Sequence, residues 1–469
     1  MVVTKPTIHQ TLRKEPPVLI MHDALPLFKS FLKPACLNQR ARQLVLRCVI
    51  AFLMHLGKMS ASRVAGAIRT DARHRAQISR FMGRRFWRRC DLLGQLRTQV
   101  LEMEVRQGLF VLDIDQTYCS QQGKLTENRI IRGEKTKRPK KSKQKQKKYA
   151  QRSCHCFVMG LLITPSGIRL PFFVSYYTKA CCEARKVAHR KQTDLAAQLI
   201  RELPLPPEAR VVVLGDTAFD AEAIRTACKE RQFSWIVPIN PERVFAGAKP
   251  RSKVSSLSED LTADQMVRLE VHPGKGKYVD YRRTSRYRIG PKIKPRTYYV
   301  HEESRDVRSV GKVRLFFSTT KTPAQCHRVE VQKILMTNDE KLALRDVIEL
   351  YQLRWQIELF FKELKSTLGL HHYRFKEFDK VETWVTLCLV TFVYLEWIRS
   401  RKLKQTSLKK KERAWWQPQR TYGLALAVRQ EAELRELKLL ADKLESPTGR
   451  KALAKQLRQS HPTEYRVAM

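Results

Sequence analysis

The spacing of apolar residues divides the chain into a helical start, a strand-rich middle and a helical end. Residues 1–105 read as helical, and Leu44–Leu56 forms their most apolar helix. A second short helix, Ser60–Thr70, opens on a serine and carries small residues and arginines. This pattern is typical of a helix-turn-helix DNA-binding module. A helical bundle with a basic surface fits it equally well.

From Leu109 onward the pattern changes to short apolar runs bounded by turn residues, which are typical of buried strands. Leu109–Asp115 predicts a strand that ends in acidic residues. The predicted elements that follow are strands Cys156–Ile163 and Ile168–Ser175, helix Thr193–Arg201, strand Arg210–Leu214 ending at Gly215-Asp216, helix Phe219–Arg231 and strand Ser234–Pro238. Strands followed by alternating strands and helices predict an α/β fold with a mixed sheet flanked by helices.

Residues 241–335 break this alternation because they are rich in Arg, Lys, Pro and Gly. Their strand-like runs are short, as in Tyr298–Val300 and Val313–Phe317. We therefore predict an inserted, mainly β, basic subdomain.

Helical periodicity returns at about Asp339 and continues past Leu370, and another apolar helix spans Val381–Ile398. The tail from about Ser400 is basic and helical, with spaced leucines over Leu424–Leu444. The chain then divides into a helical, DNA-binding domain (1–105), a first core part (106–240), a β-rich insertion (241–335), a second core part (336–400) and a basic helical C-terminal region (401–469).

The charge points to nucleic acid. Ninety-one Lys and Arg face forty-five Asp and Glu, which leaves a formal net charge of +46. A polyanion compensates such a charge, and DNA phosphates do so with release of counterions; a generally basic protein, such as a ribosomal one, shares this composition. The basic stretch Lys135–Lys148 predicts a solvated loop, which could grip a DNA backbone beside a carboxylate site.

Two further features bear on location and metals. The first seventeen residues lack an apolar segment and no apolar stretch reaches membrane-spanning length, so we expect a soluble, cytoplasmic protein bound to DNA. The eleven cysteines fit no small disulfide framework. Cys154-His155-Cys156 and Cys181-Cys182 match no common zinc motif, and strand packing accounts for the first group.

The stretch from Tyr351 to Lys365 carries the first candidate chemistry. On one helix, at about 100° per residue, its apolar side chains form a core stripe, and Glu363 points roughly 140° away from Glu358. A second, adjacent stripe gathers Tyr351, Arg354, Glu358 and Lys365. One carboxylate among these groups suits a metal ligand with phosphate-binding side chains beside it. A surface row of ion pairs is the alternative.

Two more acids follow buried strands. Asp115 ends the first strand and Asp216 follows Arg210–Leu214, and open α/β sheets place their sites at such strand ends. Together with Glu358 they would offer oxygen ligands for two Mg²⁺ or Mn²⁺ ions. Two ions about 4 Å apart can activate an attacking oxygen and stabilise a leaving one.

These motifs resemble the insertion-sequence-four family of bacterial DDE transposases. Tyr351, Arg354, Glu358 and Lys365 keep the spacing of that family's Tyr-(2)-Arg-(3)-Glu-(6)-Lys signature. The stretch Asp115-Gln116-Thr117 resembles its Asp-x-Thr motif, and 216–220 resembles its Asp-x-x-(Phe/Tyr)-Asp pattern. The resemblance covers about residues 105–400.

The resemblance implies a ribonuclease-H-like catalytic core interrupted by a β-rich insertion. It also implies cut-and-paste transposition, in which an activated water nicks each transposon end and the freed 3′-OH attacks target DNA. Two-ended cutting calls for a homodimer on paired terminal inverted repeats, in the bacterial cytoplasm at the nucleoid. The implied roles are catalysis and metal binding for Asp115, Asp216 and Glu358, and DNA binding for Tyr351, Arg354 and Lys365.

Two points stay open at this stage. Asp113 lies on the same strand face as Asp115, so either could be the first ligand, and the spacing to Thr117 favours Asp115. Relatives that form a DNA hairpin hold a flipped base with an aromatic residue, often a Trp in the insertion, yet no Trp lies between Pro241 and Arg354. The aromatic residues that could stack there instead are Tyr281, Tyr287, Tyr298 and Phe317.

Two other functions share these motifs. One is a transposase-derived DNA-binding protein without catalysis, which a missing carboxylate would favour; all three carboxylates are present. The other is a nuclease that cuts DNA and does not join it, which would use the same metal site.

Overall fold

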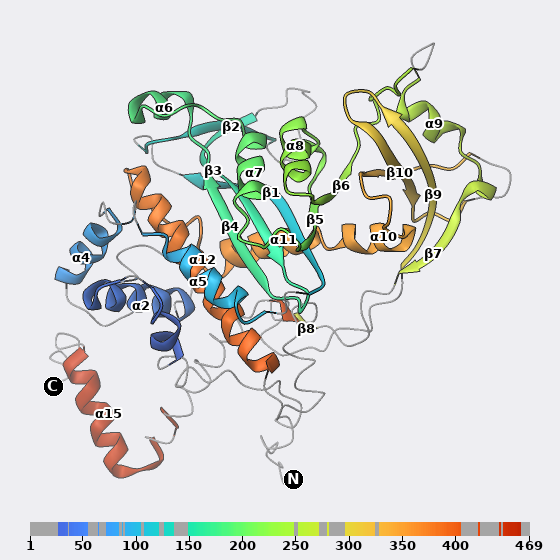
Figure 1. Ribbon diagram of the computed structural model, residues 1–469. Helices are drawn as coiled ribbons and strands as arrows, with labels where there is room; N and C mark the ends of the chain where they lie inside the picture. Colours follow the sequence, from blue (N-terminus) through green and yellow to red (C-terminus); the bar gives the residue numbers. More distant parts are fainter. Residues whose placement is uncertain are drawn as a thin grey trace, which may run out of the picture.

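A single mixed sheet organises the computed structural model (Figure 1). Within the described residues it has ten strands, in the order β2-β3-β1-β5-β6-β11-β10-β9-β7, with β4 also paired to β3. This confirms the mixed α/β class. The structure describes residues 27–35, 37–54, 64, 72–83, 87, 90–104, 107–121, 126–135, 149–247, 252–271, 279–280, 296–323, 328–404, 421–422, 440–441 and 444–460.

The strand bounds agree with the sequence pattern where apolar runs are short and sharply bounded. β5 and β6 have the predicted bounds, and β4 returns along β3 through a turn at 164–167, as predicted. The strands are β1 Leu109–Gln121, β2 Ile130–Lys135, β3 Tyr149–Ile163, β4 Arg169–Ser175, β5 Arg210–Leu214, β6 Ser234–Pro238, β7 Val267–Val271, β9 Arg296–Val307, β10 Gly311–Thr319 and β11 Lys333–Thr337, with a separate pair, β8 Val279–Asp280 and β12 Thr421–Tyr422.

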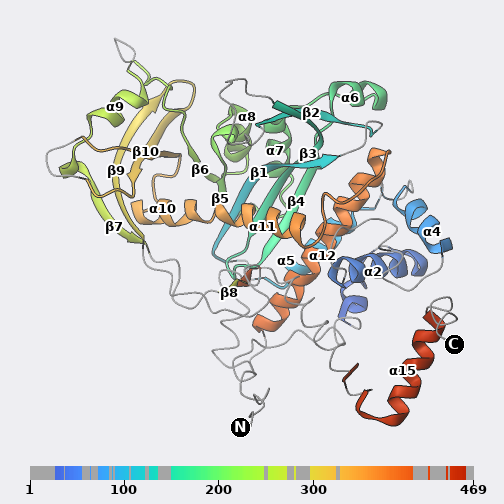
Figure 2. The same ribbon diagram turned by 180° about the vertical axis from the view of Figure 1, so that it is seen from behind.

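Helices cover both faces of the sheet. Helices α7 and α8 lie on the face toward the viewer in Figure 1, and α10 and α11 run end to end across the opposite face (Figure 2). The helices are α2 Gln39–Met54, α4 Ala72–Met82, α5 Leu92–Leu101, α6 Lys179–Arg185, α7 Gln192–Arg201, α8 Glu222–Glu230, α9 Val254–Asp260, α10 Leu344–Gln352, α11 Trp355–Ser366, α12 Phe378–Lys404 and α15 Pro447–Ser460, with 3₁₀ turns η4 Thr217–Phe219 and η5 Ala263–Gln265.

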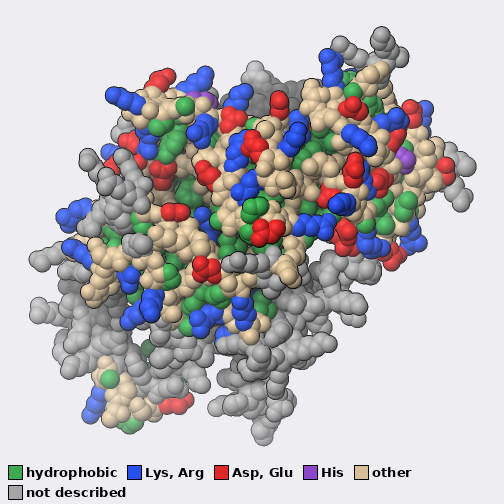
Figure 3. Space-filling view, viewed as in Figure 1, with side chains coloured by type: hydrophobic (Ala, Val, Ile, Leu, Met, Phe, Trp, Pro, Cys, Tyr) green, Lys and Arg blue, Asp and Glu red, His purple; other side chains and the backbone are tan. Residues whose placement is uncertain are grey.

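The face with α7 and α8 carries charges of both signs. Figure 3 shows Lys and Arg side chains interspersed with Asp and Glu over most of this face, and gathered around α6. The large positive charge of the chain is therefore not concentrated there. The acidic motif residues of β1 point to the opposite face, toward α10 and α11.

Helix α12 is the centre of the largest apolar core. Trp384 and Trp397 are almost fully buried, and Phe52 of α2 packs edge-on against Trp384 at 4.9 Å between ring centroids. Helices α2, α4 and α5 all contact α12, so the N-terminal helices share a core with the sheet. The domain limits at 105 and 400 stay predictions.

We expected no uninterrupted apolar stretch of membrane-spanning length. Helix α12 is long and apolar enough to cross a membrane by length and composition alone. However, 89% of its most apolar window is buried inside the protein, as in a core helix that is apolar on all sides.

A buried ion cluster joins β4, α11 and α12. The Arg169 guanidinium donates to the Glu396 carboxylate at 2.8 Å, and Glu363 approaches it at 3.9 Å. Arg399 contributes a second cation, 3.4 Å from Glu396. The side chains of Arg169, Glu396 and Arg399 are at most 1% exposed. Glu363 thus points into the core and away from Glu358, as its helical angle predicted.

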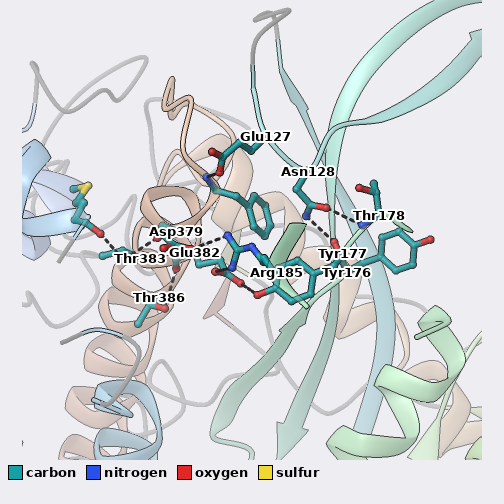
Figure 4. A network of polar contacts seen from close by, with 12 residues as sticks. Glu127, Asn128, Tyr176, Tyr177, Thr178, Arg185, Asp379, Glu382, Thr383 and Thr386 are labelled. Atoms are coloured by element: carbon teal, nitrogen blue, oxygen red, sulfur yellow. Dashed lines mark hydrogen bonds and ion pairs between the residues drawn. The ribbon is translucent and has the colours of Figure 1, made fainter. Parts of the chain in front are cut away.

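A second polar network fixes α6 and the segment before β2 against α12 (Figure 4). The Asn128 side chain donates to the Tyr176 carbonyl and accepts from the Thr178 amide, both at 2.8 Å. The Arg185 guanidinium pairs with Asp379 of α12 at 2.7 Å. This end of the sheet is therefore held by specific polar contacts as well as by apolar packing.

The predicted β insertion continues the core sheet. Strand β11 pairs antiparallel with β6, and β10, β9 and β7 follow by further antiparallel pairing. The predicted boundary between residues 335 and 336 falls inside β11. Ladder hydrogen bonds therefore run without a gap from the core into the insertion.

Several predicted segments cannot be compared with the structure. Those that lie wholly or almost wholly outside the described residues are the helix at 60–70, the basic loop at 135–148, the leucine-spaced stretch at 424–444, and Tyr281 and Tyr287.

We predict that Glu396→Ala lowers the free energy of unfolding by about 3–5 kcal/mol, because it leaves Arg169 and Arg399 buried without their main carboxylate. Urea unfolding followed by tryptophan fluorescence measures this. The control is Glu230→Gln, which removes the exposed partner of Arg201 and should leave the midpoint unchanged. Equal midpoints for both variants would contradict the prediction.

Candidate active site

Strand β1 carries three polar residues on the face of the sheet that α11 covers. Asp113, Asp115 and Thr117 alternate along it, so their side chains point to the same side, toward α11. Contrary to the prediction, Asp115 does not end the strand, because antiparallel pairing with β3 continues to Gln121. The parallel partner β5 does end at this level, since Asp113 pairs with Leu214. Asp115 therefore lies just past the end of β5.

Asp216 lies two residues past the end of β5, at that same edge of the sheet. Its carboxylate accepts a hydrogen bond from the Ala218 amide at 2.9 Å and caps the short η4 helix. The preceding Gly215 has little room, because a Cβ atom there would meet Phe219 at 3.0 Å. Asp216 therefore lies near Asp115, which is in the middle of β1, and its charge acts on that carboxylate.

The second aspartate of this motif has a structural role. Asp220 is buried and pairs with Arg225 at 2.6 Å and with Arg243 at 2.7 Å. Arg243 lies at the start of the insertion, so this pair ties the loop after β5 to that segment.

The prediction that residues 351–365 form one helix is wrong. Helix α10 ends at Gln352 and α11 begins at Trp355. Between them the Arg354 amide bonds to the Tyr351 carbonyl, three residues back, so the chain turns more tightly than an α-helix. The break lets α10 pack toward β6 and β7 while α11 packs on β1. Two helices can follow the twist of a wide sheet better than one straight helix can.

Arg354, at this break, connects two of the three predicted carboxylates. Its guanidinium pairs with Glu358 in the next turn and lies 3.7 Å from Asp115. All three side chains are partly accessible: Asp115 is 17% exposed, Arg354 19% and Glu358 33%. The groups are sheltered by the protein and still open to a ligand.

The charges of the three carboxylates act on one another. Burial is the main reason that the pKa of Asp115 rises to about 6, and the charges of Asp216 and Glu358 raise it further. The Gln116 amide and Arg354 act in the opposite direction. Asp216 and Glu358 therefore both lie close enough to Asp115 for their charges to act on it.

Asp113 differs from Asp115 in access. Its side chain is fully buried, and burial raises its pKa well above the ordinary value, against the lowering effect of Arg354. Neither carboxyl oxygen has a hydrogen-bond partner of ordinary geometry among the described residues. Asp115 is the acid on this strand that a ligand from solvent can reach, which agrees with the spacing to Thr117.

The two remaining signature residues, Tyr351 and Lys365, lie in different surroundings. Tyr351 is buried beside Arg354, and burial raises the pKa of its hydroxyl. Lys365 lies two turns along α11, with its ammonium 5.8 Å from the centre of the Phe361 ring and close enough to Cys119 to affect that thiol. The four signature residues therefore form an extended row, which starts beside the carboxylates and ends at Lys365, near Cys119 of β1.

The donor set suits a hard divalent cation. Three carboxylates that repel one another offer the oxygen ligands that Mg²⁺ prefers. In the described part of the chain, no three acidic, His or Cys side chains stand in metal-holding geometry, and Arg354 lies between two of the acids. The residue types fit the ion, and their arrangement needs Arg354 to move aside.

Sequence reasoning missed two residues at this site. Lys333, the first residue of β11, lies with its ammonium 4.8 Å from the centre of the Tyr351 ring. Trp355, the first residue of α11, is 58% exposed directly after Arg354. Neither belongs to a spaced motif, and only the pairing of β11 with β6 brings Lys333 here.

Comparison with known proteins supports the same region. The family model described as transposase DDE domain matches residues 111–394, which includes β1, β5 and α11. None of the curated proteins compared with the chain matches it.

We predict that ionisation of Asp115 destabilises the metal-free protein. Its folded pKa, about 6, lies above the ordinary 3.8, so the folded state holds the proton more tightly. Stability is then highest below pH 3.8 and falls as the pH rises through about 6, by up to about 3 kcal/mol at pH 7. Asp115→Asn removes this loss.

Urea midpoints of wild type and Asp115→Asn, measured with EDTA from pH 4 to pH 8, test this. The variant should gain on wild type as the pH rises through this window. A difference that does not change with pH would show that Asp115 titrates normally.

Proposed function

Because the chain belongs to the transposase DDE domain family, we propose that it cleaves DNA at transposon ends and joins the freed 3′-OH to target DNA. The family makes the chain a transposase and DNA its partner. The chemistry at the cut is the further step that this proposal adds.

The observation that carries the proposal is that Arg354 pairs with Glu358 and lies 3.7 Å from Asp115, while the charge of Asp216 also acts on Asp115. These acids lie in or just after β1, β5 and α11, separated by more than 100 residues of sequence at each step. A cluster of like charges at a partly open sheet edge is unfavourable unless a cation or a ligand compensates it. Arg354 does so in this structure.

Asp115, Asp216 and Glu358 would hold two Mg²⁺ or Mn²⁺ ions. When bound, the ions supply a nucleophilic oxygen at neutral pH and neutralise charge on the leaving oxygen. A released Arg354 can then hold a phosphate of the DNA, through the two-pronged contact that guanidinium groups form with phosphates. Lys365, farther along α11, would hold the backbone about two helical turns away.

The strand order supports the ribonuclease-H-like core that the sequence resemblance implies. An antiparallel group, β1, β3 and β4, leads through α7 to the parallel strands β5 and β6. The signature spacing also supports membership of the insertion-sequence-four family. We further propose a homodimer on paired terminal repeats in the bacterial cytoplasm, at the nucleoid. The exposed Trp355 offers an aromatic surface beside Arg354 on which a flipped base could stack.

We predict that Glu358→Gln abolishes excision and spares DNA binding, because it removes a metal ligand and keeps the shape of the side chain. Losing a residue that only supports a metal ligand already costs about 10- to 100-fold in activity or metal affinity. The assay supplies a marker flanked by the element's own terminal repeats, in cells that express either form of the protein.

The matched control is Glu349→Gln, an exposed glutamate of α10 that pairs with Arg345. Excision and reinsertion with wild type and this control alone would support the proposal. Excision at wild-type rate with Glu358→Gln would refute the site. Excision with none of the proteins, although wild type binds the repeats, would favour a DNA-binding protein without catalysis, and cutting without reinsertion would favour a nuclease.

We also predict different outcomes for the two aspartates of β1. Asp115→Asn should abolish cleavage, because Asp115 is the accessible acid, whereas Asp113→Asn should keep most of it, because Asp113 is fully buried and burial opposes its ionisation. Mg²⁺-dependent nicking of a duplex with one terminal repeat measures both. The reverse order would assign the metal to Asp113.

A further inference from the structure

Lys333 comes to the site from the insertion side of the sheet. It opens β11, which pairs antiparallel with β6, and the neighbouring Ile334 carbonyl accepts from the Ile239 amide at 3.1 Å. Strands β5 and β6 are parallel, so their carboxyl ends share one edge of the sheet. Lys333 therefore lies at the edge where Asp216 leaves β5.

The Lys333 ammonium is held there by an aromatic ring. It lies 4.8 Å from the centre of the Tyr351 ring, within range of a cation–π contact. Such a contact uses the ring face and leaves N–H groups of the ammonium for another acceptor. Tyr351 itself lies in the signature stretch, three residues before Arg354.

The surroundings of Lys333 are those of a cation without its own anion. Lys333 is exposed overall, but partial desolvation and the charge of Arg354 lower its pKa, and only the charge of Glu358 acts to raise it. No carboxylate among the described residues lies within ion-pair distance of it. Arg354, in contrast, is engaged with both Asp115 and Glu358.

On the basis of the function proposed above, we propose that Lys333 is a further DNA-binding residue of the site, which holds one backbone phosphate close to the cleavage point. A phosphate is the anion that a transposase brings to this edge, and it is compatible with three nearby carboxylates only where cations separate the charges. Lys333 would provide that separation from the β11 side, and Arg354 from the helix side.

A purely structural role predicts something different. If Lys333 only covers the Tyr351 ring, its alkyl chain is what matters, and Lys333→Met keeps much of that packing while it removes the charge. Lys333→Arg keeps the charge. Lys312→Met is the matched control, since Lys312 is a 75% exposed lysine of the adjacent β10 with a partner in Glu340.

The test measures binding to a duplex that carries the terminal repeat flanking this gene, with EDTA present so that the DNA stays intact. Loss of one phosphate contact should lower the slope of log K against log salt by about 0.9 and weaken binding roughly 10-fold at 0.1 M salt. We expect this for Lys333→Met, and wild-type behaviour for Lys333→Arg and Lys312→Met. Equal urea midpoints verify that all variants are folded.

The same duplex with single methylphosphonate substitutions locates the contact. One neutralised phosphate near the cut should weaken wild-type binding and leave Lys333→Met unaffected. If every substitution weakens both proteins equally, or if Lys333→Met keeps the wild-type salt slope, the proposal is wrong.

Mg²⁺-dependent cleavage of this duplex separates the two proposals. Wild type that binds but does not cut refutes the proposed function, while the Lys333 binding result still stands. Wild type that cuts, with Lys333→Met equal to it in binding and cutting, refutes the role of Lys333 alone. Wild type that does not bind the duplex refutes both.

Discussion

The structure around the site depends on how two aspartates are accommodated on the inner face of β1. Asp113 is fully buried and Asp115 largely so, in surroundings where burial opposes ionisation of both. Arg354 supplies positive charge beside them, 3.7 Å from Asp115 and paired with Glu358. Its backbone occupies the break between α10 and α11, so the helix break places this cation beside the carboxylates.

Much of the fold could be predicted because each element is determined by a short stretch of its own sequence. β5, β6 and α7 each consist of a short run with one periodicity, bounded by Gly, Pro or polar residues, and their predicted bounds hold within about a residue. The end of β1 and the break at Arg354 could not be predicted in this way. β1 is extended by its pairing with β3, some 40 residues later, and the break depends on what each helix covers in a wide, twisted sheet.

The site divides in a similar manner. Local patterns selected the site residues: Asp115 and Asp216 each follow an apolar strand run, and Arg354 and Glu358 belong to one short spaced motif. They gave no sign of Lys333, which reaches Tyr351 only through strand pairing, or of the salt bridges around Asp220. Arg169 and Glu396 are 227 positions apart in sequence, so no local pattern could predict their ion pair. Long-range partners of charged residues are what a single sequence conceals.

The unbroken ladder from β1 to β7 also has a mechanical meaning. A subdomain joined by a flexible linker can rotate relative to its neighbour. Here each backbone hydrogen bond between β6 and β11 opposes sliding of the insertion against the core. A load applied to the insertion, such as a bent DNA segment, would be transmitted as strain to the edge of the sheet that carries Asp216. Substrate engagement at the insertion strands would then act on the geometry of the carboxylates through the sheet itself.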